Sequence, residues 1–158
     1  MKFAHDIHAE TNPAFCATII AQFCEAYQKN RGSGPLVAAV YLVLPIVLSE
    51  DLASTFDKCV GSTGLLVWLD RSPRIRTGLA NRVNATLSVS TEAIRFGCFT
   101  GMLRMESRGE IASSHRKLPA EVSSGVAAEA IKRAKLLGSW FAAVGSTRAV
   151  MEGMGVSV

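Results

Sequence analysis

The chain has 158 residues, of which 49% are apolar and 19% charged, and its formal net charge is +4. This length favours one domain over residues 1–158. The apolar share exceeds what the core of such a domain needs, so part of the apolar surface is expected to contact protein partners.

The charge, the cysteine spacing and the N-terminal sequence limit the kinds of ligand, site and cellular location that the chain can have. The positive excess permits contact with nucleic acid without requiring it. The cysteines, Cys16, Cys24, Cys59 and Cys98, include no C-x-x-C pair, which argues against a zinc site or a redox motif. The N-terminal sequence MKFAHDIHAE carries charged residues where a signal peptide needs an apolar segment, which favours a cytoplasmic chain with reduced thiols.

The N-terminal third is predicted to begin with a helix over residues 12–31. Asn12 is suited to cap it, Pro13 suits its first position, and the glycines of residues 31–35 end it and form a flexible joint. The apolar run LVAAVYLVLPIVL over residues 36–48 is too short to cross a bilayer, so a buried segment bent or ended at Pro45 is expected, and no membrane partner.

A short helix is predicted next. Ser49 is the expected N-cap, and Glu50 and Asp51 in the first turn suit the positive end of the helix dipole. Residues 61–64 then form a loop.

The middle of the chain, residues 62–114, has the element order of a winged helix. A short helix over residues 65–69 is followed by a helix that starts at Ser72-Pro73 and by another capped by Ser90. Alternating residues from Leu103 then predict a β-hairpin, whose loop is residues 107–109. Element order alone is weak support for a winged helix.

The C-terminal part, residues 123–155, is predicted to be helical. An apolar stripe runs to a stop at Gly145, and Ser146 caps a last short helix. The fold class expected is therefore mainly α: a helical bundle with a small β-hairpin, winged-helix-like in its middle part.

No set of residues predicts catalysis or metal binding. His5 and His8 lie three apart with Glu10 nearby, but no spacing motif supplies a further ligand. His115 stands beside two cations, which makes it a poor acid. The carboxylates are scattered, so we expect no catalytic residues, no metal, no cofactor and no enzymatic activity.

Basic residues cluster between positions 71 and 117, where nine cations and three acids give a net charge of +6. Arginine predominates, and its guanidinium suits phosphate and carboxylate groups. The alternatives are contact with DNA, contact with an acidic partner, or a solvated face. The candidate contact residues are Arg71, Arg74, Arg76, Arg82, Arg104, Arg108, Arg116 and Lys117.

Large apolar side chains outside the apolar run are candidate anchors of a protein interface. They are Phe15, Phe23, Tyr27, Trp140, Phe141, Met151 and Met154. Trp68 is expected in the core, whereas core and interface are equally favoured for Trp140.

Four stretches carry a resemblance to a known family. They are residues 12–16 leading to Phe23 and Tyr27, residues 41–48 (YLVLPIVL), residues 62–69 (STGLLVWL) with the Ser72-Pro73 helix, and residues 137–156 from LGSWF to GMGV. In this order and spacing the chain resembles the middle component of the three-component ABC (Lamassu-like) anti-phage defence systems. The resemblance does not cover the hairpin arginines.

That resemblance implies an operon with two larger partners. One would be an SMC- or Rad50-like coiled-coil ATPase and the other an effector, often a nuclease, with double-stranded DNA met through the complex. The chain would be a non-catalytic connector that joins them. The alternative is a stand-alone winged-helix DNA-binding regulator, but residues 91–100 offer only Arg95 for reading bases.

Overall fold

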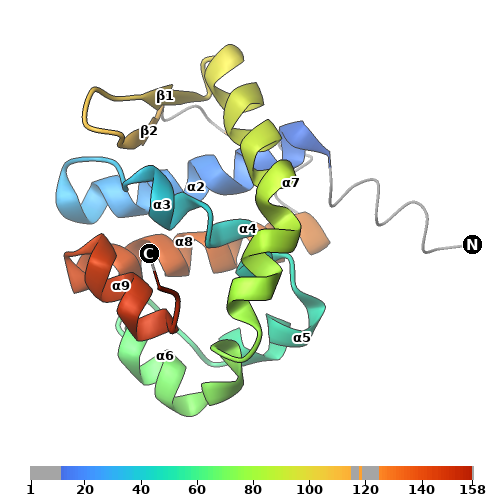
Figure 1. Cartoon of the computed structure of the whole chain (residues 1–158), viewed down its shortest axis with the longest axis vertical. Helices are drawn as coiled ribbons and strands as arrows, with labels where there is room; N and C mark the ends of the chain where they lie inside the picture. Colours follow the sequence, from blue (N-terminus) through green and yellow to red (C-terminus); the bar gives the residue numbers. More distant parts are fainter. Residues whose placement is uncertain (1–11, 115–117, 119–124, 158) are drawn as a thin grey trace, which may run out of the picture.

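The computed structural model describes residues 12–114, 118 and 125–157, and it confirms the expected fold class: mainly α with a small antiparallel hairpin (Figure 1). In chain order the elements are α2 (Pro13–Arg31), α3 (Val37–Val40), α4 (Val43–Val47), α5 (Glu50–Ala53), η1 (Ser54–Phe56), α6 (Leu65–Arg71), η2 (Pro73–Ile75), α7 (Leu79–Phe99), β1 (Leu103–Met105), β2 (Ile111–Ser113), α8 (Val126–Val144) and α9 (Thr147–Met154).

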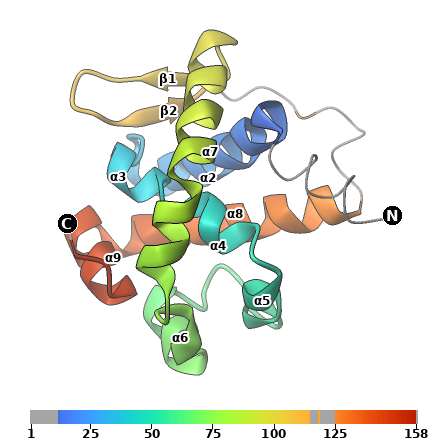
Figure 2. The same cartoon turned by 45° about the vertical axis from the view of Figure 1, so that its right-hand side comes forward.

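The first helix, α2, lies at the centre of the fold and packs against both α7 and α8 (Figure 2). It begins as predicted, because the Asn12 side chain accepts hydrogen bonds from the backbone N–H groups of Ala14 (2.9 Å) and Phe15 (3.3 Å). It ends as predicted at Gly32, whose φ of 78° suits glycine. These caps fix where the central helix starts and stops.

Helices α2 and α8 approach closely at Gly138. A Cβ at this position would overlap the carbonyl oxygen of Phe23 and would lie 3.0 Å from the Cβ of Ala26. The rings of Phe23 and Phe141 meet edge to face nearby, with centroids 5.5 Å apart. The absence of a side chain at Gly138 therefore lets α2 and α8 come together.

The apolar run forms two short helices, α3 and α4, and most of it is buried as predicted. The run is broken as expected, but the break comes one turn before Pro45, which lies in the first turn of α4. Proline has no N–H to donate to the carbonyl of Tyr41, so the helical hydrogen bonds fail one turn earlier. The break therefore falls at Tyr41 and Leu42.

Among the described residues, no single helix is both long and apolar enough to cross a bilayer. One pair, Val37–Val47 with Glu50–Phe56, passes a test of length and composition, but it is bent by 93°.

Helix α7 is continuous over 21 residues, which corrects the prediction of two helices separated at Ser90. Hydroxyl side chains in this stretch suggested a cap, but Thr86 and Thr91 donate back to the helix carbonyls of Arg82 (3.0 Å) and Leu87 (2.8 Å). Ser90 is fully buried inside the helix. The three-helix order behind the winged-helix interpretation is therefore not formed.

The hairpin has the predicted three-residue loop, since Glu106 N–H donates to the Glu110 carbonyl (2.8 Å) and Gly109 has a φ of 75°. It is fixed in place rather than projecting as a wing. Ser113 N–H donates to the Gln28 side chain of α2 (2.7 Å). Ile111 N–H donates to the Pro35 carbonyl (2.9 Å), so the predicted flexible joint is packed against the hairpin.

The rings of Phe56, Trp68 and Trp140 fill the part of the core between α6 and α8. The Trp68 ring lies 4.9 Å from that of Phe56 and 5.4 Å from that of Trp140, measured between centroids. The Trp68 indole donates to the Thr55 carbonyl (3.1 Å) and the Trp140 indole to the Gly61 carbonyl (3.2 Å). The expectation that Trp68 belongs to the core is confirmed, and Trp140 joins it.

Cysteine reactivity follows from burial. Cys16, Cys24 and Cys59 are buried, whereas Cys98 is exposed on α7. Burial raises the pKa of the Cys24 thiol, because desolvation penalises the reactive thiolate. We predict that iodoacetamide at about pH 8, near the ordinary thiol pKa, labels the native chain once, at Cys98, as read by peptide mass spectrometry.

The matched control for this labelling is Cys98→Ser, which should leave the native chain unlabelled. All remaining thiols should react once the chain is unfolded. Labelling of Cys24 at the rate of Cys98 would contradict the described core.

Candidate protein-interaction surfaces

The described part of the chain contains no cluster of three or more His, Cys, Asp or Glu side chains that could hold a metal ion. His5, His8, Glu10 and His115 lie outside the described residues.

The predicted basic cluster is divided between the two ends of α7. Arg71, Arg74, Arg76 and Arg82 lie at its N-terminal end, whereas Arg104 and Arg108 lie on the hairpin beyond its C-terminal end. A helix of 21 residues is about 30 Å long. Arg116 and Lys117 lie outside the described residues. The structure thus does not gather the described arginines into one basic face.

Three of the described arginines, Arg74, Arg76 and Arg82, join different elements of the chain. Arg76 donates to the Gly153 carbonyl of α9 (2.7 Å), and Arg74 donates to the Ser54 hydroxyl (2.7 Å). Arg104 pairs with Glu106 on the hairpin at 2.7 Å. Arg71 and Arg108 are exposed and make no ion pair with another described residue. Sequence spacing could not reveal the contacts of Arg74 and Arg76, whose partners lie 20 and 77 residues away.

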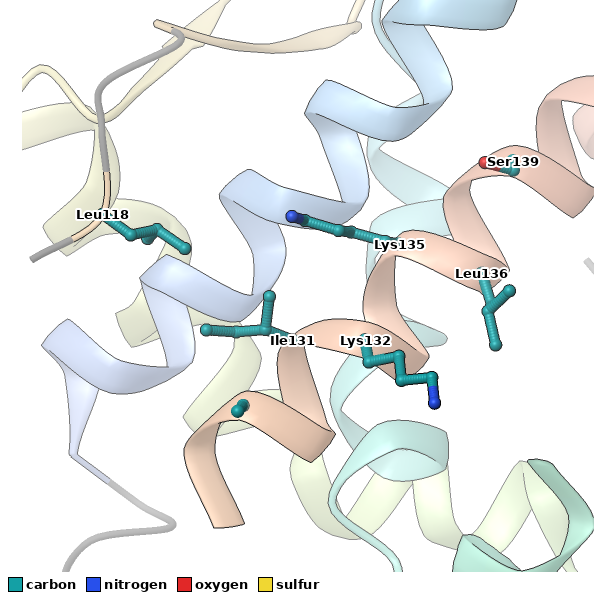
Figure 3. A pocket seen from close by; sticks show the side chains of 7 residues that line it. Leu118, Ile131, Lys132, Lys135, Leu136 and Ser139 are labelled. Atoms are coloured by element: carbon teal, nitrogen blue, oxygen red, sulfur yellow. The ribbon is translucent and has the colours of Figure 1, made fainter. Parts of the chain in front are cut away.

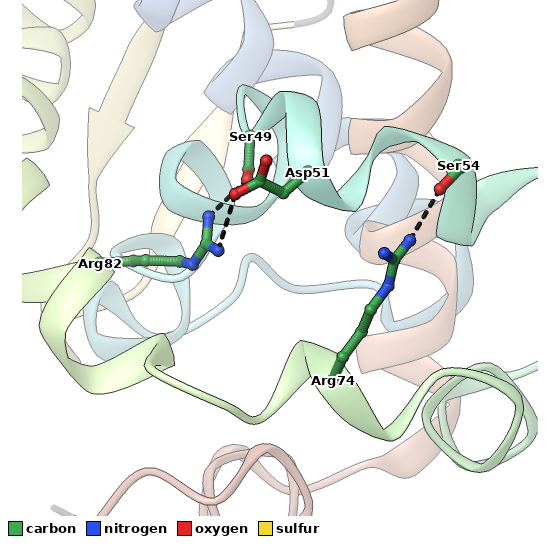
Figure 4. A network of polar contacts seen from close by, with 5 residues as sticks. All are labelled: Ser49, Asp51, Ser54, Arg74 and Arg82. Carbon is green, nitrogen blue, oxygen red and sulfur yellow. Dashed lines mark hydrogen bonds and ion pairs between the residues drawn. The ribbon is translucent and has the colours of Figure 1, made fainter.

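Arg82 joins α7 to the start of α5 (Figure 4). Its Nη1 donates to the Ser49 hydroxyl (2.6 Å), and its Nη2 pairs with Asp51 (3.2 Å). Ser49 lies at the predicted N-cap position. Its hydroxyl, contrary to the prediction, accepts no hydrogen bond from the backbone of α5. The Ser49 hydroxyl instead accepts a hydrogen bond from Arg82, and the Asp51 carboxylate binds the same guanidinium group.

We predict that Arg82→Ala lowers the free energy of unfolding by less than about 1 kcal/mol, as is usual for exposed ion pairs. The side chains of Arg82 and Asp51 are 35% and 77% exposed, so water and salt screen their attraction. Urea denaturation measures the change. Arg95→Ala, which breaks the exposed pair with Glu92, is the matched control; a loss above about 2 kcal/mol at Arg82 alone would contradict this prediction.

A groove of about 300 Å³ lies beside Arg82, between α4 and α7. We call it the α4–α7 groove. Its lining is mainly apolar and includes Leu44, Pro45, Leu48, Ala85 and Val89. It is open in the isolated chain and is the first candidate surface for a partner.

Most of the expected interface anchors are buried in the core of the chain. The six buried ones, each at most 8% exposed, are Phe23, Tyr27, Trp140, Phe141, Met151 and Met154. Phe15 alone among the seven is half-buried. A regular apolar helix face looks the same in sequence whether it meets the chain's own core or a partner.

The large apolar side chains that are exposed were not singled out from the sequence. Leu66 is 63% exposed, Phe99 92% and Val126 82%. Helix phase could have found Leu66, because Leu65, Trp68 and Leu69 of α6 are buried and leave it outward. The apolar surplus therefore does reach the surface, at positions other than the predicted anchors.

A larger groove, of about 410 Å³, follows the outer face of α8 (Figure 3). We call it the α8 groove. Ile131 and Lys135 extend toward Leu118, whereas Lys132 and Leu136 extend away from it. The remaining lining residues are Ala128 and Ser139. An apolar floor with two flanking lysines is suited to an amphipathic protein segment.

The sequence matches the family model of the ABC-three component (ABC-3C) system Middle Component 3 over residues 2–158. The chain belongs to this family. The match confirms the resemblance found in the sequence and extends it to nearly the whole chain. No match was found among curated proteins or among solved structures.

As a middle component of a multi-subunit ABC-3C system, the chain has protein partners. The two apolar grooves are therefore the surfaces to consider for contact with them.

Proposed function

We propose that this middle component is a non-catalytic connector in a Lamassu-like bacterial anti-phage defence complex. It joins an SMC- or Rad50-like coiled-coil ATPase to an effector subunit, often a nuclease, in the cytoplasm. ATP binding and the effector's chemistry belong to the other two subunits. The family match supports this proposal, because it makes the chain one component of a multi-component system.

The observation that carries the connector role is the pair of separate grooves. The α4–α7 groove and the α8 groove share no lining residue. Helices α2 and α4 each contact both α7 and α8. Two partners can then occupy the chain at the same time, which a connector requires and a single-site inhibitor does not.

Contact with double-stranded DNA is assigned to the assembled complex rather than to a basic face of this chain. The described arginines are divided between the two ends of α7, and four of them bond within the chain. A stand-alone DNA-binding regulator has less support, because it needs an outward recognition helix and a free wing, and the hairpin here is bonded to α2.

The proposal is tested by co-purification from the native operon with a tag on this chain, followed by native mass spectrometry. The expected result is one assembly that contains this chain, a coiled-coil ATPase and an effector, stable through gel filtration. The same purification from a strain that lacks the ATPase gene shows whether the effector is retained without the ATPase, including by non-specific binding to the column. A chain that elutes alone, with neither partner, would overturn the connector role.

A further inference from the structure

We infer that the α8 groove binds an acidic amphipathic helix of one of the two partner subunits. This inference rests on the proposed function and deepens it by assigning one groove a ligand chemistry. It follows from the shape of the groove and from its charge, which also argues against a second copy of the chain as the ligand.

The groove is built along one face of a helix. Ala128, Ile131, Lys135 and Ser139 recur every three or four residues on α8, and Lys132 and Leu136 run beside them. From residue 128 to residue 139 the helix rises about 16 Å, or three turns. Leu118 forms a separate rim. A long, shallow apolar strip of this length is suited to a second helix laid along it.

The charges of the groove are unbalanced. Lys132 and Lys135 are exposed, and neither pairs with an acid among the described residues. No acidic side chain of the described residues lines the groove. The adjacent α2–α8 hollow does contain Glu25, but that carboxylate pairs with Lys29 at 3.5 Å. A ligand helix that balances the two lysines carries carboxylates three or four residues apart, beside its apolar stripe.

The same charges argue against a second copy of the chain in this groove. A symmetric dimer through α8 places the same patch on both sides of the interface. Lys132 and Lys135 would then face the same lysines, which is unfavourable without acids between them. The α4–α7 groove lacks this polarity, because its one cation, Arg82, is already bonded to Ser49 and Asp51.

The test is charge reversal in the assembled complex. Lys132→Glu with Lys135→Glu changes the net charge by −4 on the groove, and Arg95→Glu with Arg148→Glu makes the same change at exposed positions elsewhere. The groove variant should bind one partner at least about tenfold more weakly, equal to about 1.4 kcal/mol. The other partner should stay bound. The control variant should bind both partners as the unaltered chain does, and circular dichroism should show all three chains folded.

A photo-crosslinker at Ser139 in the otherwise unaltered chain identifies the occupant by peptide mass spectrometry. Crosslinking to a partner segment with acids beside an apolar helical stripe supports the inference. Crosslinking to a second copy or to residues 1–11 of the same chain overturns it. If the unaltered chain binds both partners and the groove variant does so equally well, only this inference fails. If the unaltered chain binds neither, the connector proposal itself fails.

Discussion

Replacing Gly138 with alanine will lower the free energy of unfolding by about 1–3 kcal/mol, the usual effect of overpacking a core. An added Cβ would overlap the Phe23 carbonyl oxygen, which belongs to the backbone of α2 and cannot rotate away. Alanine improves intrinsic helix propensity by about 0.5–1 kcal/mol, but separating α2 from α8 costs more. Urea denaturation followed by circular dichroism measures the change.

The matched control is Gly153→Ala on α9. Its nearest neighbour, the Cδ1 atom of Leu69, lies 4.0 Å from where the new Cβ would be, so the methyl group fits. Here only the helix propensity changes, and stability should rise by up to about 1 kcal/mol. Equal gains at Gly138 and Gly153 would show that α2 and α8 are not in the close contact described.

Replacing Trp68 with alanine will lower the free energy of unfolding by about 3–5 kcal/mol, as large-to-small changes of buried aromatic residues do. The ring is fully buried and contacts both Phe56 and Trp140, so alanine leaves a cavity between α6 and α8. It also removes the indole donor to the Thr55 carbonyl. The total stability of a domain is about 5–15 kcal/mol, so this variant should lose a large share of it.

Trp68→Phe keeps a ring but loses the indole donor, so its loss of stability should be smaller than that of alanine and remain measurable by denaturation. Leu66→Ala, on the same helix at a position 63% exposed, should change stability by less than about 0.5 kcal/mol. A Trp68→Ala variant as stable as Leu66→Ala would contradict the aromatic core.

Helix ends were predictable from sequence because their chemistry is local. Asn12 and Ser146 accept hydrogen bonds from N–H groups two or three residues ahead, and Gly32 and Gly145 adopt positive φ. Ser90 misled for the same reason, since a serine in sequence does not reveal whether it caps a helix or lies inside one. Ser90 lies inside α7 because this part of the helix packs against the central helices α2 and α4.

The candidate surfaces were less predictable because they depend on how helices are arranged in space. The arginines are close in sequence, yet the length of α7 separates them. The large apolar residues predicted as anchors are mostly buried in the core, because burying large apolar side chains contributes most to the free energy of folding. The lysines of the α8 groove lie outside the +6 stretch and were not among the candidate contact residues, although the spacing places them on the polar side of the helix.

The connector role is tested most directly by asking whether the ATPase and the effector need this chain to stay together. The tagged ATPase is purified from the operon with the gene for this chain intact, deleted, or deleted and supplied from a plasmid, and the effector that copurifies is quantified. The account predicts that the effector is lost on deletion and restored by the plasmid. Equal amounts of effector with and without this chain would contradict it.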